Sequence, residues 1–170
     1  SRIAKSAPIK TQRLCAYSFS NLATCPRSRA KMTDQMVVLT MLEMTRQTSN
    51  DEEIKNECAN TVSRLALEIN CREKIVQQGA ISAVVGMCYA REPGVPNSVH
   101  RDRVCAAALK TLSLDGDNAE KMLQDDAIPA LIALINNNDR IVRQDCARCL
   151  TIMFEYEAGI DRMIDQGAVE

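Results

Sequence analysis

The sequence predicts an all-α fold in which one helical unit recurs in tandem. Three observations predict it: a Cys-Ala pair recurs at intervals of 43, 47 and 41 residues, apolar residues follow each pair at fixed offsets, and glycine and proline fall almost entirely between the periodic segments. The four pairs begin at Cys15, Cys58, Cys105 and Cys146. Offsets of zero, one, four and seven residues share one stripe of a helix with a period of 3.6 residues. The residues at offsets four and seven are Phe19 and Leu22, Val62 and Leu65, Leu109 and Leu112, and Leu150 and Met153.

The register of the unit persists well beyond this first stripe. Seventeen residues after each Cys stands one of Met32, Ile75, Met122 and Met163. A register held over that distance in four copies indicates an internal repeat rather than a local helix propensity. We therefore expect the stripes of all copies, cysteines included, to form one continuous interior.

A corner precedes the second helix of each unit. Two copies place a glycine there, Gly79 and Gly167, which suits a backbone with positive φ. The third copy has Asp126, a residue type that tolerates the left-handed region. The first copy has Met36, so we expect its corner to be built differently.

Periodicity and helix-breaking residues predict the elements in order. Pro26 ends the first long helix, the polar run 48–51 caps the next one, and Pro129 lies just inside a later helix. The segment 91–98 (REPGVPNS) interrupts the pattern and accounts for the longest spacing. The expected helices are 10–24, 27–34, 35–47, 52–69, 70–78, 80–91, 99–114, 118–124, 128–136, 140–155 and 159–165. They group into one domain, 1–170, with units 10–24 (partial), 27–69, 71–114, 117–155 and 158–170 (partial).

This pattern resembles the armadillo repeat. The resemblance rests on a short helix, a Gly-Ala-Ile corner, an apolar second helix and a third helix with the pattern Cys/Ala-Ala-x-x-Leu-x-x-Leu; it covers nearly the whole chain and is strongest over 56–135. The segment 138–143 (NDRIVR) is also similar to the Asp…Val-Arg pattern of the related HEAT repeats. The resemblance implies a right-handed α-solenoid of three-helix units. In that family the third helices line a concave groove in which partner proteins lie extended.

Composition excludes several classes of partner. The net charge is −1, aromatic residues make up 3% and tryptophan is absent, so we expect no nucleic acid partner. No apolar run approaches the length of a membrane helix, so we expect no membrane insertion. Eight cysteines, four of them at one buried repeat position, together with the absence of an Asn-x-Ser/Thr acceptor, favour a reducing compartment. We expect a cytoplasmic protein; a nuclear, cytoskeletal or ciliary location is also compatible.

No constellation of residues predicts catalysis, a cofactor or a metal site. Cys146 and Cys149 have metal-ligand spacing, but no second Cys/His pair lies nearby and both fit helix packing. His100 is the only histidine, and no nucleophile can be assigned to it. Acid pairs such as Glu52-Glu53 fit helix caps and solvated faces. We therefore expect a protein that is not an enzyme.

One set of polar positions predicts a binding surface. On each long helix, the positions two before, two after and six after the Cys lie opposite the core stripe. They hold Arg13, Tyr17 and Asn21; Asn56, Asn60 and Arg64; Arg103, Ala107 and Thr111; and Gln144, Arg148 and Ile152. These twelve positions include four arginines and no acid, which predicts that the face grips an extended acidic or phosphorylated segment of a partner protein. The alternative is a solvated face without a partner.

Two further functions stay open. The first is structural: the units could pack within a larger cytoskeletal or ciliary assembly, or self-associate through exposed ends. The chain begins with Ser1 and stops within a unit, so we expect it to be a piece of a longer solenoid. The second is an adaptor for basic peptides of the nuclear-import type. In that family branch a ladder of tryptophan and asparagine binds the peptide. Here tryptophan is absent, and the asparagine positions hold Asn21, Arg64, Thr111 and Ile152. The segment 91–98 is an additional candidate for recognition.

Overall fold

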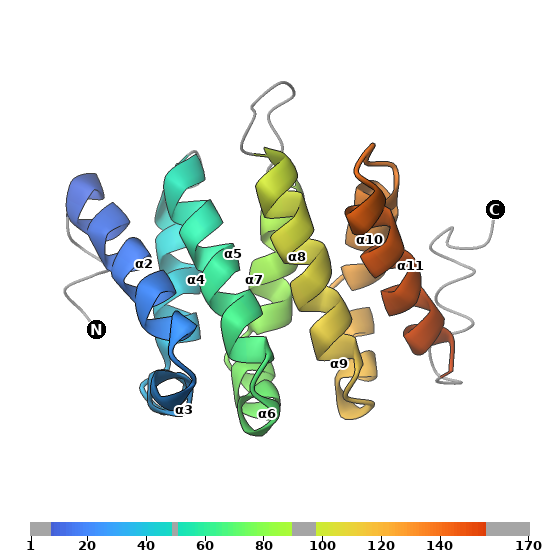
Figure 1. The fold of residues 1–170 in the computed structure, drawn as a ribbon, viewed down its shortest axis with the longest axis horizontal. Coiled ribbons are helices and arrows are strands. Elements are labelled where there is room, and N and C mark those ends of the chain that lie inside the picture. The colour runs from blue at the N-terminus through green and yellow to red at the C-terminus, as the bar shows by residue number, and fades with distance from the viewer. Residues whose placement is uncertain (1–7, 49–50, 90–97, 156–170) are drawn as a thin grey trace.

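Helices account for all the regular secondary structure in the part of the chain that the computed structural model describes, which is residues 8–48, 51–89 and 98–155 (Figure 1). The helices are α2 (Ile9–Thr24), α3 (Pro26–Asp34), α4 (Val37–Gln47), α5 (Glu52–Ala66), α6 (Ile69–Gln77), α7 (Ala80–Tyr89), α8 (Ser98–Ser113), α9 (Asp117–Gln124), α10 (Ala127–Ile135) and α11 (Arg140–Phe154). The all-α prediction is confirmed for these residues. The predicted helix 159–165, the unit 158–170, Met163, Gly167 and most of the segment 91–98 lie outside the described residues.

The helices form three rows. The long helices α2, α5, α8 and α11 lie side by side and make the most extensive contacts with one another (Figure 1). Behind them α4, α7 and α10 form a second row, and the short helices α3, α6 and α9 form a third row along one edge (Figure 1). Each successive short, medium and long helix therefore repeats the same arrangement, as expected for a helical repeat.

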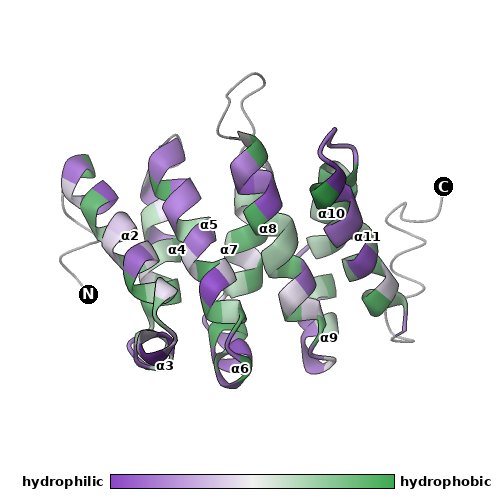
Figure 2. Ribbon diagram, in the orientation of Figure 1, coloured by the Kyte–Doolittle hydropathy of each residue, from purple (hydrophilic) through white to green (hydrophobic). Residues whose placement is uncertain are grey.

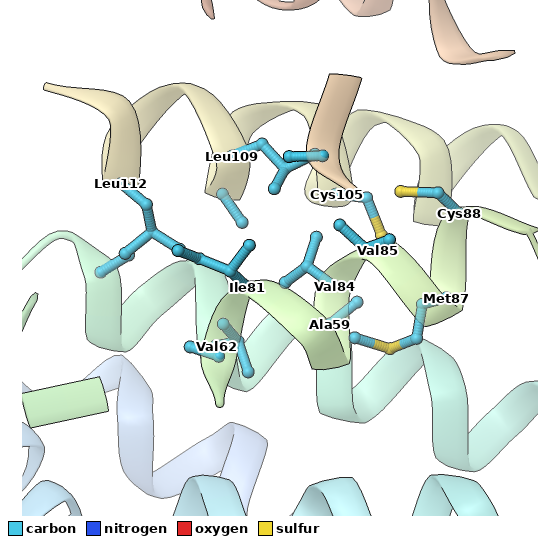
Figure 3. Close-up of a cluster of buried hydrophobic side chains, with 14 of the residues drawn as sticks. Ala59, Val62, Ile81, Val84, Val85, Met87, Cys88, Cys105, Leu109 and Leu112 are labelled. Atoms are coloured by element: carbon cyan, nitrogen blue, oxygen red, sulfur yellow. The ribbon is translucent and has the colours of Figure 1, made fainter. Parts of the chain in front are cut away.

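The core lies between the first two rows. In Figure 3, Ile81 and Val84 of α7 point between Val62 of α5 and the pair Leu109 and Leu112 of α8. All five side chains are at most 1% exposed. The core stripe of the two central units is therefore confirmed, and each unit contributes to an interior shared with the next.

The first copy of the stripe departs from the prediction. Leu22 is 51% exposed, whereas Cys15 and Phe19 are only partly buried. Among the described elements, α2 has α5 on one side and no helix on the other. A stripe needs a neighbour on both sides to be covered, so the outer half of this one remains in contact with solvent.

The prediction that the first unit has a different corner is corrected by the structure. Met36 has a φ of 55°, in the same left-handed region as Asp126 (57°) and Gly79 (87°). We expected a different corner because methionine has no special tolerance for this region. Val37 and Val38, directly after the corner, are buried. Packing of α4 against α5 therefore imposes the turn despite the cost of the methionine backbone.

Replacing Met36 with glycine is expected to stabilise the chain. The left-handed conformation costs a residue other than glycine about 1–2 kcal/mol of folding free energy, and glycine avoids this cost. Glycine also raises the conformational entropy of the unfolded chain, which offsets part of the benefit, so the expected net gain in stability is ~0.5–1 kcal/mol. Met36 is exposed, so little packing is lost. Urea denaturation of Met36→Gly measures the gain. Leu67→Gly is the matched control, because Leu67 is equally exposed but has a φ of −64°, and it is expected to destabilise.

A side chain from the following short helix donates a hydrogen bond to a backbone carbonyl at the end of three long helices, which the sequence pattern did not predict. Arg29 Nε donates to the Ala23 carbonyl (2.9 Å), and Arg72 Nε donates to the Ala66 carbonyl (2.8 Å). In the third unit Asn118 Nδ2 donates to the Leu112 carbonyl (3.0 Å). Each bond satisfies a carbonyl at a helix C-terminus that has no partner within its own helix.

The starts of two long helices follow the expected capping chemistry. Asp51 accepts from the Ile54 N–H (3.0 Å), and Asp139 accepts from the N–H groups of Ile141 (2.9 Å) and Val142 (3.2 Å). These bonds satisfy donors that are unpaired at the start of any helix. Helix α5 ends at Ala66, three residues before the predicted boundary at 69, because the turn into α6 uses Leu67 and Glu68.

None of the eight cysteines, all of which lie in the described part of the chain, forms a disulfide. Cys58, Cys105 and Cys146 are almost completely buried at their repeat position, as predicted. Burial raises the pKa of the Cys58 thiol well above its usual value. These cysteines therefore act as small apolar groups in the interior.

Cys25 is expected to be the most reactive thiol. It is exposed and occupies the N-cap position of α3, where the backbone N–H of Arg27, followed by the side chain and N–H of Ser28, lowers the pKa of its thiol. A lowered pKa means that the thiolate is already present at a lower pH. The rate of iodoacetamide alkylation at Cys25 should therefore reach its half-maximum at a lower pH than for cysteine in an unstructured peptide. An equal or higher midpoint would contradict the placement of Cys25 at the cap.

Candidate partner-binding face

The predicted binding positions lie on the row of long helices, on the side away from α4, α7 and α10. We call this side of α2, α5, α8 and α11 the open face. Figure 2 shows hydrophilic residues along α5 in this row and hydrophobic residues in α10 behind it. The exposed members of the set are Arg13, Tyr17, Asn21, Arg103, Gln144 and Arg148. The half-buried members are Asn56, Asn60, Arg64, Ala107, Thr111 and Ile152.

Two of the four arginines bind the helix caps of the following unit. Arg13 Nε lies 2.9 Å from Asp51 Oδ2, and Arg13 Nη1 lies 3.3 Å from Glu53 Oε2. Arg103 donates from Nε (2.8 Å) and Nη2 (2.6 Å) to Asp139 Oδ2. The Arg103 guanidinium holds the pKa of the Asp139 carboxyl below its usual value, and the N–H groups that Asp139 caps lower it further. Both arginines therefore join neighbouring long helices.

The third arginine is also engaged within the chain. Arg64 Nη1 donates to the backbone carbonyl of Ser20 (2.8 Å) and lies 2.5 Å from its Oγ. This joins α5 to α2 near the end of both helices. Charge reversal at Arg64 would therefore disturb packing as well as any partner, which makes it a poor probe of binding.

Arg148 differs from the other three. No hydrogen bond or ion pair holds its guanidinium among the described residues, and its side chain is exposed on α11. It borders a hollow of about 350 Å³ between α8 and α11, lined by Lys110, Leu114, Arg148, Thr151 and Ile152. Lys110 Nζ lies 2.6 Å from Asp145 Oδ1. This end of the open face therefore combines one unpaired cation with apolar side chains.

The opposite end of the open face is acidic. A hollow of about 580 Å³ spans α2, α5 and the start of α8, and four of the eight residues that line it are acids. It is lined by Arg13, Asp51, Glu52, Glu53, Asn56, Glu57, Asn60 and His100. The acidic or phosphorylated segment expected along the whole face would therefore meet carboxylates at this end. The twelve positions contain no acid, but neighbouring helix-start residues place their carboxylates on the same surface.

Polar groups in this acidic hollow vary in how far their hydrogen bonds are satisfied. Asn60 Oδ1 lies 3.2 Å from His100 Nε2, which joins α5 to α8. Asn56 Oδ1 is buried without a hydrogen-bond partner in the described part of the chain. Thr111 Oγ1, further along the face, donates to the Ala107 carbonyl of its own helix (2.7 Å).

The prediction that Glu52 lies on a solvated face at a helix cap is corrected by the structure. Its carboxylate pairs with Arg101 of α8, whose side chain is 0% exposed, and with Lys55 Nζ at 3.1 Å. Arg101 lies 49 residues away along the chain, so the local sequence around Glu52 does not predict this ion pair. Glu52 therefore links α5 to α8 inside the stack.

The cysteine pair considered for metal binding is packed in the protein interior. Cys146 and Cys149 are both fully buried, and burial raises the pKa of Cys149 to about 12. Within 8–48, 51–89 and 98–155, no three His, Cys, Asp or Glu side chains gather closely enough to hold a metal ion. In the same ranges, every helix is too short or too polar to cross a lipid bilayer.

Comparison with known proteins supports the fold alone. No protein-family model and no curated protein matches the chain. Three similar solved structures are engineered proteins from the Northeast Structural Genomics Consortium. They are 19%, 19% and 20% identical to the chain, with TM-scores of 0.76, 0.75 and 0.78. Their alignments cover 95%, 95% and 96% of this chain.

The same alignments cover 64%, 65% and 39% of the engineered proteins, so the chain spans less than two thirds of their length. At this identity the likeness concerns the fold and carries no function. Together with the three rows of helices, it places the chain in the class of helical repeat proteins.

Proposed function

We propose that the chain is an armadillo-type solenoid that binds an extended segment of a partner protein along the open face and catalyses no reaction. The observation that carries this proposal is unused hydrogen-bonding capacity beside both hollows of that face. Asn56 Oδ1 is buried without a partner, and the Arg148 guanidinium is unpaired in the described part of the chain. Buried polar groups are normally hydrogen-bonded, and a bound segment would supply the missing partners.

The partner chemistry is narrower than the sequence alone predicts. Asp51 and Asp139 already neutralise Arg13 and Arg103, and carboxylates surround the hollow at α2 and α5. An acidic side chain would be repelled there and attracted at α8 and α11. We propose an acidic group in the partner, placed toward α11 rather than spread along the face.

Photo-crosslinking tests the location of the binding surface. Peptides selected from a random displayed library against the 170-residue chain are resynthesised with a photo-reactive leucine, and the crosslinked residues are identified by mass spectrometry. Crosslinks on α2, α5, α8 and α11 are expected. Crosslinks confined to α3, α6 and α9, or to α4, α7 and α10, would contradict the proposal.

Self-association is a second candidate that one observation favours. Leu14 and Leu22 are exposed on α2, where no described helix covers them. Apolar side chains gathered on an uncovered helix favour contact with another copy or another module. Sedimentation over a concentration series distinguishes the two functions, since dimerisation that Leu14→Glu abolishes would support assembly through this end.

A further inference from the structure

We propose that the hollow between α8 and α11 is the anchor point for the partner and that it takes one carboxylate side chain and one aliphatic side chain of an extended segment. We call this hollow, lined by Lys110, Leu114, Arg148, Thr151 and Ile152, the anchor hollow. The inference rests on the proposed function and specifies which chemistry the open face recognises.

The apolar part of the anchor hollow fits an aliphatic side chain. Leu114 is 58% exposed and Ile152 is partly buried, although both are large apolar residues. Leu114 directly follows α8, and Ile152 lies in the last turn of the neighbouring helix α11. A single aliphatic side chain between them would remove apolar surface of both residues from water.

The charge of the anchor hollow fits one carboxylate. Lys110 is paired with Asp145, so Arg148 supplies the only uncompensated charge among the residues that line the hollow. A guanidinium binds a carboxylate through two parallel hydrogen bonds. A phosphate dianion would leave one negative charge uncompensated and would lie near the Asp145 carboxylate. We therefore assign the site to Asp or Glu rather than to a phosphorylated residue.

The corresponding places in the other units lack this combination. Between α5 and α8, the position of Arg148 is held by Ala107 and that of Ile152 by Thr111. Between α2 and α5, the position of Arg148 is held by Asn60 and that of Ile152 by Arg64, whose guanidinium is bound to Ser20. The repeat therefore builds the anchor hollow once among the described units, which fixes where along the open face a partner is held.

The spacing of the two groups predicts a motif in the partner. Arg148 and Ile152 are four residues apart on one helix, so their Cβ atoms are separated by about 6 Å. In an extended segment, side chains at i and i+2 point to the same side and lie about 7 Å apart. The anchor hollow therefore fits a segment in which the acid and the aliphatic residue are separated by one residue.

A charge exchange tests the assignment. Random 12-residue peptides are selected against the 170-residue chain, and their dissociation constants are measured by fluorescence anisotropy. We expect enrichment of Asp or Glu two residues from Leu, Ile, Val or Met. Arg148→Glu should weaken the selected peptide at least about tenfold, and a peptide with the acid replaced by Lys should regain most of that loss on Arg148→Glu.

Arg143→Glu is the matched control, because it makes the same charge change on α11 outside the anchor hollow and should leave affinity unchanged. Circular dichroism melts verify that each variant is folded. Peptides that crosslink to the open face but show neither the motif nor the Arg148 effect would overturn the anchor hollow and leave the proposed function standing. Failure to select any peptide that crosslinks to the open face would overturn both.

Discussion

Leu112→Ala is expected to lower the free energy of unfolding by about 2–5 kcal/mol, the usual cost of removing a buried leucine side chain together with the cavity that is left. Leu112 is 0% exposed and belongs to the stripe of α8 that faces α7 (Figure 3). Its carbonyl also accepts the bond from Asn118 that closes α8, so the surrounding backbone has little freedom to collapse into the cavity.

Urea denaturation followed by circular dichroism measures this loss. The control is Leu114→Ala, which makes the same change two residues later on a side chain that is 58% exposed. The control should change the free energy of unfolding by less than ~0.5 kcal/mol. Similar losses in both variants would show that the core stripe of α8 is misassigned.

Glu52→Gln is expected to cost about 3 kcal/mol, the lower end of the range for breaking a buried ion pair. The substitution keeps the shape of the side chain and removes the charge that faces the Arg101 guanidinium. Arg101 is fully buried, whereas Glu52 retains 20% side-chain exposure, which is why we expect the lower end. Lys55 loses its carboxylate partner in the same variant.

The matched control for Glu52→Gln is Asp34→Asn. Asp34 pairs with Lys74 at 2.7 Å, but both side chains are more than half exposed. An exposed pair contributes at most ~1 kcal/mol, so this variant should unfold close to the wild-type urea midpoint. A Glu52→Gln midpoint that coincides with that of Asp34→Asn would contradict a buried link between α5 and α8.

Helix positions could be predicted because they depend on residues near one another in the chain. The Cys-Ala stripe, the breakers and the caps are local signals, and most of the observed boundaries lie within two residues of the expected ones. The corner at Met36 could not be predicted, because a residue with no local preference for positive φ is held there by the packing of α4. Exposure of Leu22 was missed because periodicity places a residue on a stripe without showing whether a neighbour covers it.

The location of the candidate site on the long helices could be predicted from the sequence, but the charge of its surface could not. Helical spacing placed Arg13 and Arg103 correctly on the long helices, but their partners Asp51 and Asp139 are 38 and 36 residues away. Spacing within one helix carries no information about such contacts. One signal could have found them: in both units an arginine two residues before the repeat Cys is followed by an aspartate that caps the next long helix.

The shared interior of the units is the claim on which the binding face depends, because the open face exists only if the opposite stripes are buried. Native-state thiol labelling with N-ethylmaleimide, quantified residue by residue by mass spectrometry, tests it most directly. We expect Cys25 to be labelled first, while Cys58, Cys105 and Cys146 stay protected until urea unfolds the chain. Labelling of those three repeat cysteines in the folded chain at the rate of Cys25 would contradict a continuous core.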